Sequence, residues 1–525
     1  MKRRLTLLAI AAMLSSTLMA AWDGSTKTIW SSGSGTEADP YLIASEANLA
    51  YLAQQVNAGS TTYNGVYFKQ TADLDLGGVQ NSDGTWNSSG KSWTPIGNSN
   101  KLFQGSFDGN GYAISNLYIN SNTTQYVGLF GGISDATLKN ITIASGFVYG
   151  YQYAAGICSY AVGASNITCC ANIATVYGKM ERNGGVVAYI DGTTTVSNCA
   201  NYGLVSAFNF SGGVVGFCNV GTTSVSNCIN VGQVFSLRNT AGNLWGYNKN
   251  GDATITKCYY DNQINTSLGT TTTVNSIESS TDQSGKIEGK STSAMVGSSL
   301  QSALDISDWY FEDGMYPRLK MSYNNSAVVL AATPVTLASG QQADNVSSNF
   351  SISTSNSVTW TSDNTSNLAI SGTTVSILKS TGVMLTGKKD GYIKNIYLKT
   401  NKSGAIAVGS SSSPLMIETE SDLKALRNAV NNFGSYHGCA NYDGFRDIHF
   451  KVSIDIALTD WTEPIGMHNS FKGIFDGNHR TISGIAVNQS SVVIIGGLFG
   501  GASYGTIKNV SVSGSVTGKQ LVGGV

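Results

Sequence analysis

The sequence predicts an all-β protein in which two parallel β-helix solenoids flank a small β-sandwich. Three observations lead to this fold class. The composition is rich in Gly (61 residues) and Tyr (25) and poor in Pro (6), which is typical of strands and turns. Gly-started blocks recur about every 29 residues in the first half of the chain. The segment that precedes these blocks returns in the second half, and a fixed period of this size indicates stacked units.

The first element is an export signal at residues 1–21. The basic residues Lys2 to Arg4 precede an apolar run from Leu5 to Leu14, and Ala20 and Ala21 offer small residues for cleavage. This order is that of a secretory signal peptide. No later stretch reaches the roughly 20 apolar residues of a membrane span, so we expect no membrane span in the mature chain. A net charge of -1 leaves no basic face, so we expect no nucleic-acid partner.

Each solenoid is predicted to open with a capping helix. The segment Asp39–Gly59 parallels Ser413–Gly434, and a hydroxyl residue, Ser45 or Thr419, stands in each where a helix N-cap is needed. The apolar face of each helix is formed by Leu49, Leu52 and Val56, and by Leu423, Leu426 and Val430. An open solenoid end needs a cap, so each solenoid needs its own copy.

Beyond each helix the chain repeats the phrase Phe-Asp-Gly-Asn. Asp108-Gly109 and Asp476-Gly477 lie between alternating apolar runs, where Asp-Gly signals a tight turn. We therefore predict a structural role for both pairs. The alternatives are contact with a metal or a glycan, or catalysis. Catalysis needs a second carboxylate or a base, and none recurs at a constant offset in both copies.

The body of the first solenoid consists of the Gly-started blocks. They begin at Gly128, Gly156, Gly185, Gly213 and Gly242, with spacings of 28, 29, 28 and 29 residues. Within them, short runs alternate polar and apolar residues between Gly, Asn and Asp turns, as strands do. No block has the apolar stripe of a helix. We therefore expect the blocks to stack as coils of a parallel β-helix, ~4.8 Å apart.

One position of the successive blocks is occupied by cysteine. The residues are Cys170, Cys199, Cys228 and Cys258, after Ile141 in the preceding block. Cys in place of Ile predicts a small apolar side chain that points inward. Disulfides, which export permits, and a metal site are the alternatives, but in-register strands disfavour the first and the wide spacing disfavours the second. Two residues later stand Asn172, Asn201 and Asn230, which are predicted to form a ladder of turns.

The blocks resemble the GLUG motif repeats of bacterial surface proteins. The matching residues are Gly212–Gly216 and Val225–Asn230, and the closing segment Lys290–Lys320 is also similar to that family. The resemblance covers roughly residues 36–320 and 408–525. It implies a right-handed parallel β-helix in an extracellular, often adhesin-like, protein at the cell surface of a bacterium. The family supplies no catalytic residues.

Residues 325–403 carry no repeat and alternate in period two around turns, which predicts a β-sandwich. This segment resembles bacterial Ig-like modules. The expected organisation is a GLUG-type β-helix with its cap helix at residues 22–324, the sandwich at 325–403 and a second β-helix at 404–525. The second solenoid is predicted to be cut short, because Gly524 begins a block only 27 residues after Gly497. The chain is therefore expected to be a fragment.

The composition and motifs favour a non-catalytic exported protein, an adhesin or binding scaffold that contacts glycans or host or neighbouring proteins through an extended β-helix face. The candidate contact residues are Tyr149, Tyr151, Tyr153, Tyr259 and Tyr260. Aromatic rings give contact area at low entropic cost. Packing within the strands is the other interpretation of these tyrosines.

Two enzymatic alternatives remain open. The first is a polysaccharide-cleaving β-helix enzyme, which needs acids clustered on neighbouring coils. The acids of the blocks, Asp135, Glu181, Asp191 and Asp252, occupy different phases of the repeat. The second is a scaffold for an enzyme whose catalytic domain lies beyond residue 525. The chain has no nucleotide-binding, metalloprotease or serine-hydrolase motif, so we expect no cofactor and no metal.

Overall fold

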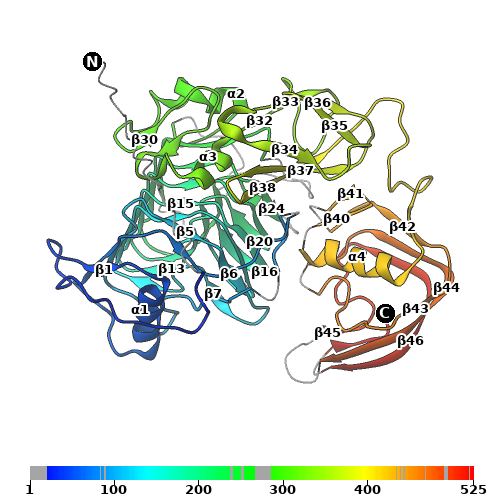
Figure 1. The fold of residues 1–525 in the computed structure, drawn as a ribbon, viewed down its shortest axis with the longest axis horizontal. Helices are drawn as coiled ribbons and strands as arrows, with labels where there is room; N and C mark the ends of the chain where they lie inside the picture. Colours follow the sequence, from blue (N-terminus) through cyan, green and yellow to red (C-terminus); the bar gives the residue numbers. More distant parts are fainter. Residues whose placement is uncertain are drawn as a thin grey trace, which may run out of the picture.

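The computed structural model describes residues 21–525 except 83, 88–89, 237–240, 250–252, 266–284, 433, 438, 442–443, 468, 490–494 and 519–520. The predicted signal peptide lies outside the described residues, apart from Ala21. Figure 1 shows three parts: a stack of strands in blue to green, a yellow-green pair of sheets beside it, and an orange to red stack. The parallel β-solenoid predicted from the repeats is confirmed, since all pairs within the large sheets of the first stack are parallel.

The first solenoid presents four faces, each a parallel sheet. The first face runs through β1 (Tyr41–Ile43), β2 (Tyr67–Gln70), β4 (Ser106–Asp108), β9 (Thr137–Lys139), β14 (Asn166–Thr168), β18 (Thr195–Ser197), β22 (Ser224–Ser226) and β27 (Thr254–Thr256). The second runs through β3 (Leu74–Asp75), β5 (Ala113–Ser115), β10 (Thr142–Ile143), β15 (Ala171–Asn172), β19 (Ala200–Asn201), β23 (Ile229–Asn230), β28 (Cys258–Asp261) and β29 (Ile287–Lys290).

The other two faces are shorter. The third face contains β6 (Leu117–Asn120), β11 (Gly146–Gly150), β16 (Thr175–Gly184), β20 (Val205–Gly212) and β24 (Val234–Ser236), with β25 (Ala241–Gly242) also paired to β20. The fourth contains β8 (Ile133–Ser134), β13 (Cys158–Val162), β17 (Val187–Asp191), β21 (Val215–Cys218) and β26 (Trp245–Asn248). A two-stranded sheet, β7 (Gln125–Val127) with β12 (Gln152–Ala154), lies between them in sequence.

The register of the first face explains why the coils stack. Its central positions align from coil to coil and are at most 2% exposed, in the order Phe68, Phe107, Leu138, Ile167, Val196, Val225 and Ile255. The flanking residues of each strand are polar and face outward, as the period-two alternation predicts. One apolar side chain per coil thus builds a continuous interior column, and its burial stabilises each coil against its neighbours.

The two ends of this solenoid are closed in different ways. Helix α1 (Glu46–Ala58) packs its apolar side into the same core as the first coils, and Ser45 accepts a hydrogen bond from the amide of Asn48 at its N-cap. The far end carries α2 (Thr292–Met295), the antiparallel pair β30 (Trp309–Tyr310) and β31 (Arg318–Leu319), and α3 (Ser326–Ala332). Trp309 and Tyr316 lie at 1% and 2% exposure in that closing cluster.

Two antiparallel sheets follow. One contains β32 (Val335–Thr336), β33 (Phe350–Ile352), β36 (Thr374–Ile377) and β35 (Leu368–Ser371), and the other β34 (Thr359–Ser362), β37 (Gly382–Lys389) and β38 (Tyr392–Lys399). Apolar side chains of both sheets form one core that includes Trp360. The indole of Trp360 donates to the Ser353 carbonyl at 3.0 Å, so this tryptophan has a packing role. We refer to these residues as the sandwich.

The second solenoid repeats the opening of the first. Helix α4 (Glu420–Asn432) precedes a parallel sheet of β39 (Leu415–Ile417), β42 (His449–Val452), β44 (Ile474–Gln489), β43 (Ile456–Ala457) and β46 (Thr506–Gly518). The short pairs β40 (Ser435–Tyr436) with β41 (Cys439–Ala440) and β45 (Ile495–Gly496) with β47 (Leu521–Val522) complete it. Its core is separate from that of the first solenoid.

The three parts meet along the third face of the first solenoid. Tyr149, Tyr177 and Phe235 of that face share a buried cluster with Tyr397 of the sandwich and Ala440 of the second solenoid. The Gln233 amide both donates to the Tyr397 carbonyl (2.8 Å) and accepts from its N–H (3.0 Å). The sandwich therefore packs directly against the first solenoid and is not merely tethered to it.

Candidate binding cleft

The four predicted ladder cysteines line the interior of the first solenoid. Each is 0% exposed, and each sulfur lies 3.2–3.4 Å from the carbonyl oxygen two residues earlier. All eight cysteines of the chain are free thiols. Burial raises the pKa of the Cys199 and Cys258 thiols, so both stay protonated and unreactive. Because all four thiols are fully buried, the ladder is packing material.

The predicted asparagine ladder exists, and Asn172 and Asn230 also cap their own turns, since their Oδ1 atoms accept from the amides of Ala174 and Gly232 at 3.2 Å. Asn172, Asn201 and Asn230 are fully buried strand residues, and their amides donate to one another at 2.9 and 2.8 Å along the stack. The left-handed backbone falls instead on the residue before each cysteine position, at Asn140, Cys169, Asn198, Asn227 and Lys257, with φ between 52° and 55°. Spacing located the amides correctly, but it did not reveal that they point inward.

The buried amides help to explain why the blocks at Gly156, Gly185 and Gly213 begin with glycine. A Cβ on Gly156 would lie 2.0 Å from Oδ1 of Asn172, and one on Gly185 would lie 2.3 Å from the amide of Asn201. A Cβ atom does not come within about 3 Å of another heavy atom, so only glycine fits against the amide. The Gly and Asn positions of the motif are thus two halves of one interior contact.

The two Asp-Gly phrases form matching corners between faces. Oδ1 of Asp108 accepts from the amide of Asn110 at 2.8 Å and from the side chain of Asn140 at 2.9 Å. Oδ1 of Asp476 does the same with Asn478 (2.9 Å) and Asn509 (3.0 Å). Gly109 and Gly477 pack closely against the next coil. In the first copy the turn joins β4 and β5, which belong to different sheets, whereas in the second copy the corner lies within β44, where the register of its pairing with β46 shifts.

Three of the five candidate contact tyrosines are inside the molecule. Tyr149, Tyr259 and Tyr260 are 2%, 5% and 6% exposed. Tyr149 packs against the sandwich, Tyr259 belongs to the closing cluster, and Tyr260 belongs to the solenoid core. The prediction of ligand contact fails for these three: later segments cover Tyr149 and Tyr259, and Tyr260 points into the core.

Tyr151 and Tyr153 are half-buried at a corner of the solenoid. The ring of Tyr153 stacks on Tyr126 with 4.6 Å between centroids, and Arg182 donates to its hydroxyl at 2.6 Å. The guanidinium also lies over the ring of Phe217 at 4.5 Å. The ring of Tyr153 also meets that of Tyr189 at 5.1 Å between centroids, so a column of rings runs from coil to coil and rigidifies the corner.

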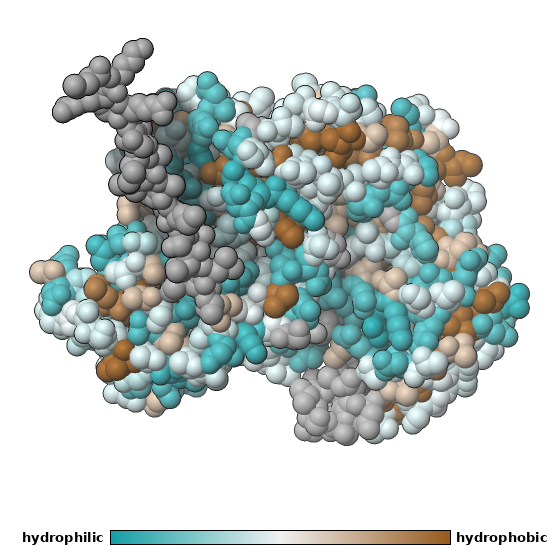
Figure 2. Space-filling view, in the orientation of Figure 1, coloured by the Kyte–Doolittle hydropathy of each residue, from teal (hydrophilic) through white to brown (hydrophobic). Residues whose placement is uncertain are grey.

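A different surface has the geometry of a binding site. A cleft of about 850 Å³ lies where the third face of the first solenoid, the sandwich and α4 meet. Tyr118 and Phe147 contribute from the third face, Thr361 and Asp363 from the sandwich, and Asn428 from α4. Figure 2 shows hydrophilic residues over the α4 side of the molecule, whereas apolar residues gather over the sandwich. A cleft of this volume at an interface between domains is typical of small-ligand binding.

Aromatic rings form one wall of the cleft. Trp86 stacks on Tyr118 (6.4 Å between centroids, 25° between planes), and Tyr118 stacks on Phe147 (6.1 Å, 26°). Trp86 sits on a tight hairpin in which the amide of Asn81 donates to the Thr85 carbonyl at 2.7 Å. Tyr118 is 2% exposed and supports the half-buried indole from beneath.

Charges in the cleft are balanced and mostly engaged. The carboxyl of Asp363 accepts from the Met384 amide at 3.1 Å, and burial raises the pKa of Asp363 to about 6. Arg427 lies 3.9 Å from a carboxylate oxygen of Glu463. Nζ of Lys388 donates to the Ser82 carbonyl at 2.5 Å. Two acidic and two cationic side chains thus line the cleft, and the remaining lining is rich in amide and hydroxyl side chains.

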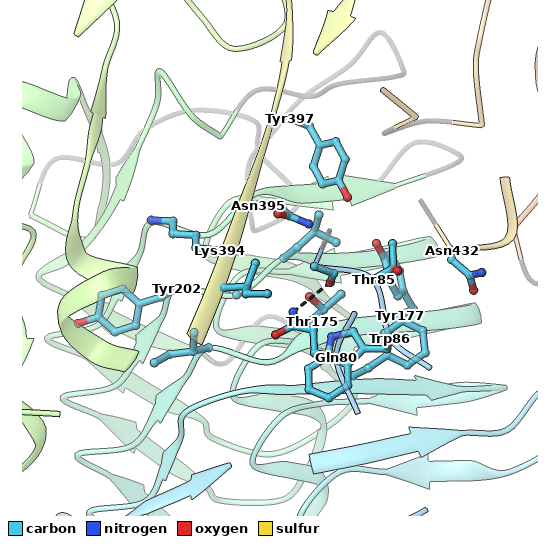
Figure 3. A pocket seen from close by; sticks show the side chains of 16 residues that line it. Gln80, Thr85, Trp86, Thr175, Tyr177, Tyr202, Lys394, Asn395, Tyr397 and Asn432 are labelled. Atoms are coloured by element: carbon cyan, nitrogen blue, oxygen red, sulfur yellow. Dashed lines mark hydrogen bonds between the residues drawn. The ribbon is translucent and has the colours of Figure 1, made fainter. Parts of the chain in front are cut away.

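The inner end of the cleft narrows between the third face and β38. Figure 3 shows Trp86 and Tyr177 on one side of this pocket and Lys394 and Tyr202 on the other. Nζ of Lys394 donates to the Ala331 carbonyl at 2.6 Å, while its stem lines the pocket. Burial lowers the pKa of Lys394 to about 8, although the charge of Asp261 opposes that shift.

The sequence analysis missed Trp86, although the chain carries a signal for it. In the first opening segment 25 residues separate Phe68 from Trp93, whereas 11 separate the matching Phe450 from Trp461. The additional residues form the hairpin that holds Trp86. A difference in length between two copies of one unit marks a place where one copy does something that the other does not.

Neither a membrane-spanning helix nor a metal cluster is found among the residues that the structure describes. No helix in those ranges is long and apolar enough to cross a membrane. No three His, Cys, Asp or Glu side chains in them gather as metal ligands would. The exposed His437 lies 3.5 Å from Asp422, which makes a surface ion pair when the imidazole is protonated.

The chain is similar to parts of known proteins, although no protein-family model matches it. It is 38% identical over 132 residues to halomucin of Haloquadratum walsbyi, which covers 24% of this chain and 1% of halomucin. It is 30% identical over 122 residues to a candidate Gly-rich membrane protein of Evansella cellulosilytica, covering 23% and 13% of the two chains. The crystal structure of a candidate immunoglobulin A1 protease from Bacteroides ovatus aligns with 56% of this chain and 96% of its own, at 18% identity and a TM-score of 0.38. The chain thus spans a small part of the length of either sequence relative.

Proposed function

We propose that this protein is an exported, non-catalytic scaffold that binds glycans or proteins at the surface of a bacterial cell. Its GLUG-type repeats supply a rigid rod, and the Ig-like sandwich holds a second, similar unit beside it; the family and the module boundaries belong to this proposal. One relative is named a membrane protein, which supports a location at or outside the membrane. The adhesin-like role rests on the resemblance of the repeats.

The observation that carries the non-catalytic role is the use of acids in the coils. Asp135 accepts hydrogen bonds from the Ala164 amide (2.9 Å) and the Ser134 hydroxyl (2.8 Å). Asp191 accepts from the side chain of Asn219 at 3.3 Å. Glu181 pairs with Arg182 at 3.7 Å. These carboxylates serve the stack at three different coil positions, whereas a glycosidase needs two of them around one bond. Asp252 lies outside the described residues.

The test is a binding and cleavage experiment with the mature chain. Labelled protein is applied to an array of glycans and to immobilised extracellular-matrix proteins, and the same glycans are incubated with it in solution. The proposal expects retention on the array and no release of reducing ends. Release of reducing ends from any glycan would establish the polysaccharide-cleaving alternative instead. Absence of retention on both kinds of surface would also overturn the proposal.

A further inference from the structure

We propose that the cleft between the first solenoid, the sandwich and α4 binds a neutral oligosaccharide, with one sugar ring stacked on Trp86. This inference rests on the proposed binding function and gives it a site and a ligand class. The cleft is lined by all three parts of the protein, so it exists only in the assembled chain. Its volume of about 850 Å³ lies within the range of small-ligand sites.

Trp86 is the element that selects a sugar. The apolar C–H face of a pyranose ring packs on a flat aromatic ring, and tryptophan offers the largest such ring. Tyr118 stacks beneath the indole and Phe147 beneath Tyr118, so the platform is fixed before a ligand arrives. A pre-organised ring loses little entropy on binding. In contrast to the column around Tyr153, this stack ends at Trp86 within the cleft.

The other walls match the rest of a sugar. Exposed amide and hydroxyl side chains reach the cleft from every part: Asn120 from the third face, Thr361 from the sandwich and Asn432 from α4. An amide both donates and accepts, and so does a hydroxyl, as sugar hydroxyl groups require. One aromatic platform with several adaptable polar groups suits a ligand that carries hydroxyl groups on every side.

Charge selects a neutral ligand over an acidic one. Lys388 and Arg427 are the cations of the cleft, and both are engaged, the first with the Ser82 carbonyl and the second with Glu463. Arg427 also lies over the ring of Trp461 at 5.2 Å. A uronate or sulfate group would have to displace one of these contacts and would meet Asp363 nearby. A sugar chain without charge meets neither cost.

The experiment compares three cleft variants with one control. Binding of the mature chain to neutral hexasaccharides of glucose, xylose and mannose, and to hexagalacturonate, is measured by calorimetry. Trp86→Ala is expected to weaken binding of the preferred neutral sugar by about tenfold or more, as loss of an aromatic anchor does. Thr361→Ala and Asn432→Ala are expected to weaken it by about twofold to tenfold each. Tyr504→Ala, an exposed aromatic outside the cleft, is expected to leave it unchanged.

The outcomes separate this inference from the function on which it rests. Loss in Trp86→Ala with an unchanged thermal unfolding profile supports the cleft. Neutral-sugar binding that survives Trp86→Ala, Thr361→Ala and Asn432→Ala overturns the cleft and leaves the scaffold function standing. Preference for hexagalacturonate overturns the neutral ligand class. Retention on protein surfaces with no sugar bound overturns the inference alone, and release of reducing ends overturns both.

Discussion

The two solenoids open with the same contacts, and the comparison separates what the fold requires from what one copy adds. Near the end of each capping helix an asparagine bridges a carbonyl and an amide of the Pro-Ile-Gly loop. The distances are 2.8 and 2.9 Å from Asn57 to Pro95 and Gly97, and 3.1 and 2.8 Å from Asn431 to Pro464 and Gly466. At the start of each helix Glu46 and Glu420 accept from an amide of a later coil, both at 2.8 Å.

The interior aromatic residues are duplicated as well. The ring centroids of Phe103 and Phe130 are 5.4 Å apart, and those of Phe471 and Phe499 are 5.2 Å apart. These repeated contacts explain the repeated sequence, because each helix needs the same loop and the same rings to close its coil. The phrase that includes Asp108 and Asp476 accompanies these contacts in both copies, and its structural role stays a prediction.

The copies differ in the segment before the first tryptophan. The first copy carries the hairpin with Trp86, and this hairpin reaches the cleft, whereas in the second copy only three residues separate the end of β43 at Ala457 from Trp461. The second copy instead turns the outer side of α4 toward the same cleft. A shared scaffold with one added loop is how binding sites are commonly placed on a fold. The comparison teaches that the difference, and not the repeat, points to function.

The strongest test of equivalence removes matched core rings. Phe107→Ala and Phe475→Ala are expected to cost about 3–5 kcal/mol each, since both side chains are 0% exposed and leave a cavity between coils. Amide hydrogen exchange in β4 and β44 measures the local loss, because a chain with several cores does not unfold in two states. A loss that differs between the copies by more than about 2 kcal/mol would show that the two openings are not equivalent.

The sequence predicted the regular part of the fold because that part is local and periodic. Blocks of 28 and 29 residues revealed the coils, and the caps at Ser45 and Thr419 revealed the helices. The cleft was out of reach, because it joins Trp86, Asp363 and Asn428, which no period relates. The prediction that Tyr149 contacts a ligand failed for the same reason, because Tyr397, which shares its buried cluster, lies in the sandwich.

The sandwich interface gives the next largest effect, and it depends on pH. The folded pKa of Lys394 is about 8, below its ordinary value of 10.5. Below pH 8 the amine is protonated in both the folded and the unfolded chain, so the cost of burying the charge is fully present. Between pH 8 and 10.5 the unfolded chain binds the additional proton, so stability rises with pH, by about 3 kcal/mol in total.

The measurement is hydrogen exchange in β38 across that range of pH, corrected for intrinsic exchange. Lys394→Met is the matched control, because methionine fills the same space without a charge. In this variant the rise in stability with pH should be absent. Because Asp261 and the Ala331 carbonyl face this amine, Asp261→Asn should alter the rise without abolishing it. Identical pH profiles for the parent and Lys394→Met would contradict the role of this amine.

The helix-end asparagines rank next and should differ between the copies. Asn431 is 3% exposed and bonds to Pro464, Gly466 and Met467, whereas Asn57 is half-buried and bonds to two groups. Asn431→Ala leaves buried backbone groups without partners and is expected to cost about 2–3 kcal/mol, against about 1–2 kcal/mol for Asn57→Ala. Exchange rates of the two Pro-Ile-Gly loops report the loss. The reverse order would mean that burial does not set the cost of this contact.

The smallest expected effect concerns the matched corners. Asp108→Ala and Asp476→Ala each remove the acceptor of a backbone amide and of a neighbouring asparagine, at an expected cost of about 1 kcal/mol. Although burial raises it, hydrogen bonds from Asn478 and Asn509 hold the pKa of Asp476 below its ordinary value. The stabilisation by Asp476 is therefore present above about pH 4 and is lost as pH falls through the folded pKa. Exchange of the Asn478 amide at pH 3 and pH 6 checks this, with Asp476→Asn as the uncharged control. Equal protection at both values of pH would show that shape, and not charge, makes the corner.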